Sequence, residues 1–146
     1  MAFDIKFVGD AFEDDGMRRQ QVSLMIGAFE ESMDADMTHW TFGDYQDQWA
    51  NELRKVIGES ARGALITSLP DPNLAFRVST WPMWREGDEI FFQSRLVGML
   101  EPDSLFHIDC LADYVCERKS INEDGILISQ WSIPVRDVIA FLDCVK

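Results

Sequence analysis

The sequence has few of the residues from which metal sites and acid–base catalytic sites are built. Two histidines and three cysteines occur in 146 residues. The cysteines, Cys110, Cys116 and Cys144, fit neither a disulfide framework nor paired CxxC zinc ligands, so reduced thiols are expected. His107 lies close to Cys110, but a structural zinc needs four ligands. The sequence therefore predicts no metal and no cofactor.

Sequence motifs for common chemistries are also missing. The chain has no P-loop, no GxGxxG, no GxSxG elbow, no HExxH and no EF-hand loop. No run approaches about eighteen apolar residues, and segment 1–8 carries acids where a secretory signal has basic residues. We therefore expect a cytoplasmic protein that is not an enzyme. A catalytic pair of carboxylates stays open, because spacing alone does not show which acids face one cleft.

Basic residues are scarce and acidic residues are plentiful. The chain has 26 Asp and Glu against 13 Lys and Arg, a formal net charge of -13. Residues 1–47 hold eleven of the acids against Lys6, Arg18 and Arg19, which leaves a net charge of -8 in this segment. Such a field repels nucleic acid and attracts basic proteins. The charge therefore indicates a basic protein partner and no direct contact with nucleic acid.

The composition predicts one folded domain over residues 1–146. Hydrophobic residues make up 47% of the chain and aromatic residues 12%, which suits one core and argues against disorder. Strand patterns occur before, between and after two helical patterns, without regular alternation. We therefore predict an α+β domain, with a mainly antiparallel twisted sheet packed with two or more helices.

The predicted strands are bounded by turn residues. Phe3, Ile5 and Phe7 alternate with other residues, which is typical of a half-buried strand. A turn is predicted at 13–16, and the polar run 30–32 is expected to end the second strand. The further strands are predicted at 20–29, 64–69, 74–84, 89–96 and 126–131.

Two features of the central hairpin lead to specific expectations. Pro82 should lie near an edge or a bulge, because proline cannot donate to the ladder. Trp81 and Trp84 lie near the predicted turn at 85–88, so we expect one of them to pack while the other is exposed. The type of segment 106–117 stays open.

Two helices are predicted. Thr41 and Asp44 have the spacing of a helix start, and Gly58 suits the C-terminal cap of helix 42–57. The apolar stripe of this helix is expected to pack in the core rather than bind a ligand. It contains Phe42, Tyr45, Trp49, Leu53, Val56 and Ile57. Pro134 suits the first turn of a final helix. The stripe predicted to be buried there is Val135, Val138, Ile139 and Leu142.

The densest acids adjoin the first helix and form the candidate binding site. Charge runs are usually solvated surface, and that interpretation stays open here. Grouped with an aromatic side chain, the same acids would give an interface long-range steering and a short-range anchor. The candidate partner-binding residues are Glu30, Glu31, Asp34, Asp36, His39, Trp40, Asp44 and Asp47.

Four blocks of sequence carry a family resemblance. They read WTFGDYQDQW at 40–49, GALITS at 63–68, WPMWREGD at 81–88 and SQWSIP at 129–134. In their order and spacing they resemble the immunity proteins of bacterial contact-dependent growth inhibition. The resemblance extends over most of the chain and includes no catalytic motif.

The resemblance implies a cytoplasmic antidote that binds the C-terminal toxin domain of a cognate effector and blocks its activity. Many such toxins are nucleases, and an RNase is the first expectation. A nuclease carries basic groups that hold phosphates, so an acidic inhibitor can occupy the same electrostatic site. Two other interpretations stay open, a small carboxylate-dependent enzyme and an acidic adaptor for another basic protein.

Overall fold

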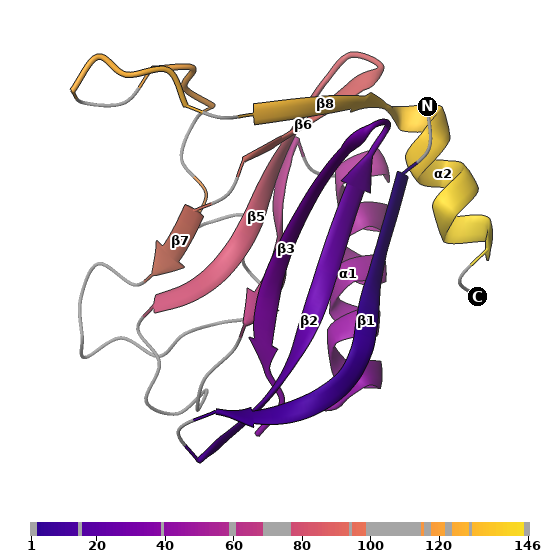
Figure 1. The fold of residues 1–146 in the computed structure, drawn as a ribbon. Coiled ribbons are helices and arrows are strands. Elements are labelled where there is room, and N and C mark those ends of the chain that lie inside the picture. Colours follow the sequence, from indigo (N-terminus) through magenta and orange to yellow (C-terminus); the bar gives the residue numbers. More distant parts are fainter. Residues whose placement is uncertain are drawn as a thin grey trace.

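Two antiparallel sheets and two helices account for the regular structure of the described chain, which confirms the predicted α+β class (Figure 1). A computed structural model describes residues 3–14, 16–38, 40–58, 61–68, 77–93, 95–98, 115, 118–121, 124–128 and 130–144. The first sheet has the strands β1 (Phe3–Asp14), β2 (Met17–Ile26) and β3 (Phe29–Asp36). The second has β4 (Arg62–Ser68), β5 (Arg77–Glu86), β6 (Glu89–Gln93), β7 (Arg95–Gly98) and β8 (Gln130–Pro134). The helices are α1 (Phe42–Gly58) and α2 (Val135–Cys144).

The first sheet follows the order β1-β2-β3, with every neighbour antiparallel. The predicted turn at 13–16 is tighter than expected, because β1 continues to Asp14 and the chain reverses at Gly16, where φ is 75°. The expectation that the acidic run ends a strand is wrong. Residues 29–36 form β3 instead, because their apolar members Met33 and Ala35 pair with β2 and face the core side.

The second sheet follows the order β4-β5-β6-β8, and β7 also pairs with β5. The predicted hairpin is confirmed, with its turn at Gly87, but β6 and β7 divide the predicted strand 89–96. Pro82 pairs with β4 at the point where the other neighbour of β5 changes from β7 to β6. Trp81 and Trp84 are both buried, so the expected exposure of one is wrong, because β5 is an interior strand of the sheet.

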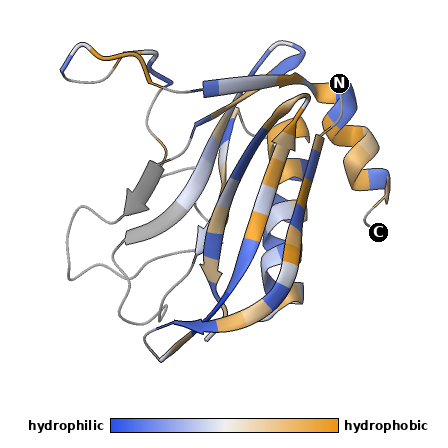
Figure 2. Ribbon diagram, viewed as in Figure 1, coloured by the Kyte–Doolittle hydropathy of each residue, from blue (hydrophilic) through white to orange (hydrophobic). Residues whose placement is uncertain are grey.

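Aromatic side chains join the sheets and helices into one core. Tyr45 and Trp49 are buried on α1, as predicted, and the Phe7 ring lies 5.4 Å from that of Trp49. The Phe3 ring stacks on Phe92 of the second sheet at 5.6 Å. Figure 2 shows apolar and polar residues alternating along the first sheet, which is the pattern of a sheet with one covered face.

The final helix is confirmed with two corrections, at Ile139 and at Pro134. Val135, Val138 and Leu142 are buried, but Ile139 is 42% exposed, so its predicted burial is wrong. Successive helical residues turn by about 100°, and Ile139 therefore points to one side of the stripe that covers the core. Pro134, predicted in the first turn of this helix, is instead the last residue of β8 and stands directly before α2, so that part of the prediction is wrong.

Side chains of α1 close the free edge of β4. Gln48 Nε2 donates to the Ala64 carbonyl and Gln48 Oε1 accepts from the Ile66 amide, both at 2.9 Å. The Trp49 indole N–H donates to the Ile66 carbonyl at 2.8 Å, and Glu52 Oε1 accepts from the Ala64 amide at 3.2 Å. An edge strand normally leaves such groups to water or to another strand. Here the helix takes the place of a neighbouring strand.

Candidate functional site

The first sheet has one face away from α1, which we call the outer face. Phe3, Ile5, Val22 and Leu24 are buried on the opposite side, so the alternate residues of each strand point outward. By register, the outer face carries Asp4, Lys6, Val8, Phe12, Arg19, Gln21, Ser23, Met25, Glu30, Ser32, Asp34 and Asp36. Figure 1 shows α1 on one side of this sheet only. The outer face is mainly polar, but Ser23 and Asp36 on it are buried, at 2% and 3% exposed.

Two of the predicted acids are exposed on this outer face. Glu30 pairs with Met25 and Asp34 pairs with Gln21, and both carboxylates belong to solvent-exposed residues. Four residues of strand separate them, a distance of about 13 Å. These two acids are placed as a surface site requires.

Two other predicted acids on β3 are withdrawn from the surface. Glu31 is half-buried on the side of the sheet that faces the core. Asp36 is 3% exposed, and its Oδ1 accepts from the Thr38 amide at 2.9 Å. The Asp36 carbonyl accepts from the Tyr45 hydroxyl at 2.6 Å, and its amide donates to Ser68 Oγ at 3.1 Å. Asp36 therefore ties β3 to α1 and β4.

Asp44 belongs to the cap of α1. Its Oδ2 accepts from the Thr41 amide at 2.9 Å and from Thr41 Oγ1 at 3.1 Å. Thr41 Oγ1 in turn accepts from the Asp44 amide at 3.2 Å, which confirms the predicted helix start. This reciprocal arrangement is a capping box, and it satisfies backbone donors that the first turn leaves unpaired.

The remaining predicted residues lie at two separate hollows. Asp47 is exposed and lines a cleft of about 540 Å³ together with Arg54 of the same helix. Trp40 is half-buried, with its ring edge-on to Tyr45 at 5.0 Å. It lines a second hollow of about 280 Å³. His39 lies outside the described residues. The predicted residues therefore do not form one site. Some are exposed on the outer face, some make hydrogen bonds that stabilise the fold, and others line these two hollows.

The two hollows do not bring together a pair of carboxylates from the described residues. The larger is lined by Ile5, Gln46, Asp47, Trp49, Ala50, Asn51, Arg54 and Phe141. The smaller is lined by Arg18, Met37, Thr38, Trp40, Thr41 and Phe42. Asp47 is the single acid in these two linings, and Arg54 shares its cleft. The pocket predicted by the carboxylate-enzyme interpretation is not formed there.

Ligand groups for a metal are similarly dispersed. Among the residues that the structure describes, no group of three or more His, Cys, Asp or Glu could hold a metal ion. His107, Cys110 and Cys116 lie outside those residues, and Cys144 is an exposed free thiol. In the same part of the chain, neither helix is long and apolar enough to cross a membrane.

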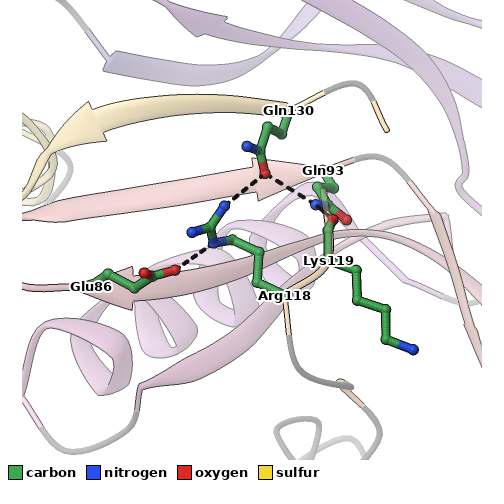
Figure 3. A network of polar contacts seen from close by, with 5 residues as sticks. All are labelled: Glu86, Gln93, Arg118, Lys119 and Gln130. Carbon is green, nitrogen blue, oxygen red and sulfur yellow. Dashed lines mark hydrogen bonds and ion pairs between the residues drawn. The ribbon is translucent and has the colours of Figure 1, made fainter. Parts of the chain in front are cut away.

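A polar network fastens residue 118 to the second sheet (Figure 3). The Arg118 guanidinium donates to the Glu86 carboxylate and lies 4.1 Å from the centroid of the Phe91 ring. Gln130 Oε1 accepts from Arg118 at 3.3 Å and from Gln93 at 3.2 Å. The hydrogen bond from Arg118 holds the pKa of Glu86 below its ordinary value.

Sequence reasoning missed two apolar residues on the outer face. Val8 is 38% exposed and Phe12 is 42% exposed, and both fall on the same side of the sheet as Glu30 and Asp34. Had the first strand been predicted to continue beyond Val8, Phe12 would have been placed on it. The acidic cluster that follows Phe12 concealed it, because such clusters usually mark turns.

Comparison with known proteins gives a consistent result. Residues 35–141 match the family model described as the CdiI N-terminal domain. A curated relative, the immunity protein CdiI of Enterobacter cloacae subsp. cloacae, is 24% identical over 139 residues, which cover 95% of each chain. A solved structure described as the CdiA-CT/CdiI toxin and immunity complex from Enterobacter cloacae has a matching chain with a TM-score of 0.88. That match has 23% sequence identity and covers 97% of each chain.

The fold and these matches define the class of the protein. It is an immunity protein of the contact-dependent growth inhibition type, which confirms the resemblance seen in the four sequence blocks. More particularly, the chain belongs to the CdiI N-terminal domain family, whose model covers well over half of its length.

Proposed function

We propose that this chain binds the C-terminal toxin domain of a cognate contact-dependent growth inhibition effector and neutralises it by stoichiometric blockade in the cytoplasm. The observation that carries the proposal is the match, over 97% of each chain, to a partner in a toxin and immunity complex. The protein acts without turnover, and residues 1–146 work as one immunity domain. Inhibition then depends on the surface offered to the toxin rather than on a catalytic centre.

The toxin is proposed to be a nuclease, with an RNase as the first candidate. A nuclease must hold phosphates with basic groups, and this chain has a formal net charge of -13. An acidic protein can occupy such a basic site and exclude the nucleic acid. The same charge argues against a direct role for nucleic acid as a partner of this chain.

Within the predicted acidic site, Glu30 and Asp34 are proposed to make the toxin contacts, because both are exposed on the outer face. Trp40 and Asp47 remain candidates at the margins, at separate hollows. The withdrawn or capping acids contribute through the long-range field. Electrostatic steering raises association rates by about 10- to 10³-fold and weakens as salt rises.

The test uses the C-terminal domain of the protein encoded immediately upstream. The two proteins are co-expressed and captured through a tag on one of them. The mass of the captured complex then gives its stoichiometry. The isolated toxin domain is then incubated with RNA and with DNA at increasing amounts of this chain. One-to-one capture, with activity that ends at an equimolar ratio, supports the proposal. Absence of capture contradicts immunity, and a captured partner that cuts neither substrate contradicts the nuclease assignment.

A further inference from the structure

The β1–β2 hairpin is bent away from the body of the first sheet by a bulge. Val8 pairs with Gln21 and Phe12 pairs with Arg19, so residues 9–11 of β1 face the single residue Gln20. Gly9 has a φ of 71°, and its carbonyl accepts from Gln20 Nε2 at 2.5 Å. A bulge of this kind bends a strand and increases its twist. In Figure 1, β1 curves strongly toward its lower end, and the β1–β2 hairpin lies at the lower left of the molecule.

The bulge and the hairpin that follows it form a largely exposed segment that we call the hairpin arm, residues 10–19. Its five residues on β1 extend over about 13 Å. The exposed residues described on the arm are Asp10, Phe12, Glu13, Asp14, Gly16 and Arg18. Before the bulge, by contrast, Phe3 and Ile5 of the same strand are buried in the core. Arg18 and Arg19 hold the β2 side of the arm against the end of β3, where the Arg18 carbonyl accepts from the Met37 amide. The exposed side chains of the arm add little to the core and can serve as a contact surface.

Phe12 is the apolar centre of this surface. Single exposed apolar residues are common, but Phe12 lies on the outer face with exposed Val8 close by along β1, and Glu30 and Asp34 border the same face. Aromatic anchors surrounded by polar groups are the arrangement that dominates binding energy in protein interfaces.

We propose that the hairpin arm inserts into the toxin domain, with Phe12 in an apolar pocket and Asp10, Glu13 and Asp14 against basic residues around that pocket. The inference rests on the proposed function and names the part of the chain that enters the partner. Residues 10–19 contain four acids and two arginines, so the arm is acidic like the whole segment. A basic protein complements this charge, whereas a nucleic acid or a second copy would be repelled.

The first test measures binding of the captured toxin domain by calorimetry. Phe12→Ala is expected to bind about tenfold more weakly or worse than the wild type. Ile139→Ala is the matched control, because Ile139 is also 42% exposed but belongs to α2. It should bind within about twofold of the wild type. If Phe12→Ala binds the toxin domain with the same affinity as the wild type, the inference about the arm is overturned and the proposed function is not. If the wild type itself does not bind the toxin domain, the proposed function is overturned.

A second pair of variants keeps the test independent of folding. Asp10→Lys reverses an exposed charge on the arm, and Asp143→Lys makes the same reversal on α2. Both variants should have the same melting temperature as the wild type. We expect Asp10→Lys to slow association several-fold more than Asp143→Lys at low salt, with the difference shrinking at high salt. Equal association rates for the two variants would contradict insertion of the arm.

Discussion

Polar side chains are buried at the edge of β4, and others are exposed on the outer face of the first sheet. At β4, Gln48, Trp49 and Glu52 are buried, and each makes a hydrogen bond to the backbone of the strand. On the outer face, Glu30 and Asp34 remain exposed. Burying a polar group without a partner costs free energy, and the buried side chains at the edge of β4 have such partners. Those left in water are available to a partner, and the comparison separates residues that hold the fold from residues that can bind.

The largest expected effect comes from breaking the closed edge of β4. Gln48→Leu leaves the Ala64 carbonyl and the Ile66 amide buried without their partners. Each such group costs about 1–3 kcal/mol, so the free energy of unfolding should fall by about 2–4 kcal/mol in urea titration. Gln46→Leu, at an exposed position of the same helix, should change it by less than about 0.5 kcal/mol. Equal losses would show that the closure is not the cause.

A smaller loss is expected at Gly63, where a side chain of α1 packs closely against β4. A Cβ at Gly63 would lie 2.8 Å from Val56 Cγ2 and 3.1 Å from Met83 Cε. Gly63→Ala should therefore lower the free energy of unfolding by about 1–3 kcal/mol through overpacking. Gly43→Ala is the control, since its nearest neighbour is Thr41 Oγ1 at 3.8 Å. That variant should gain up to about 1 kcal/mol, because alanine favours helix. The contrast fails if both variants shift stability in the same direction.

The outer face should show the reverse behaviour, with binding affected and stability preserved. The double variant Glu30→Lys with Asp34→Lys should unfold within about 1 kcal/mol of the wild type. Its association with the toxin domain should be about tenfold slower at low salt, as measured by stopped flow. The difference should shrink at high salt, because screening weakens steering. An unchanged rate at low salt would remove these acids from the proposed interface.

The smallest effect is expected at the polar network of the second sheet. Arg118 lowers the pKa of Glu86 in the folded chain relative to the unfolded chain. The resulting stabilisation is present above the unfolded pKa and is lost as pH falls through the folded pKa. Glu86→Gln should therefore narrow the difference between melting temperatures at about pH 7 and about pH 3, by a small amount because the pair is exposed. Glu89→Gln, across the turn, is the control, and the same narrowing there would contradict a role for Arg118.

The helix α1 could be predicted because its signals are local. Thr41 and Asp44 form the start, and the apolar stripe has one period along one segment. The strand β3 could not, because its pairing with β2 decides its structure and the acids obscure the apolar residues Met33 and Ala35. The period of a helix can be recognised within one segment, whereas the pairing register of a strand depends on a second segment of the chain.

The exposure of the candidate site residues could not be predicted, because it too depends on the pairing of strands. Charge density identifies a segment, but it does not distinguish exposed Glu30 from Asp36, which is 3% exposed and bonded to α1. Alternation on β3 could have separated the faces had the strand been recognised. Phe12 was missed because the bulge at Gly9 carries β1 on into a stretch that reads as a turn.

Side-chain footprinting of the toxin complex would test most directly whether the outer face and the hairpin arm form the interface. The chain is labelled with a short-lived carbene, free and bound to the upstream-encoded toxin domain, and modified residues are read by mass spectrometry. We predict that labelling of Phe12 and Val8 falls on binding while that of Ile139 on α2 is unchanged. Protection of Ile139, with Phe12 and Val8 labelled as in the free chain, would contradict the account.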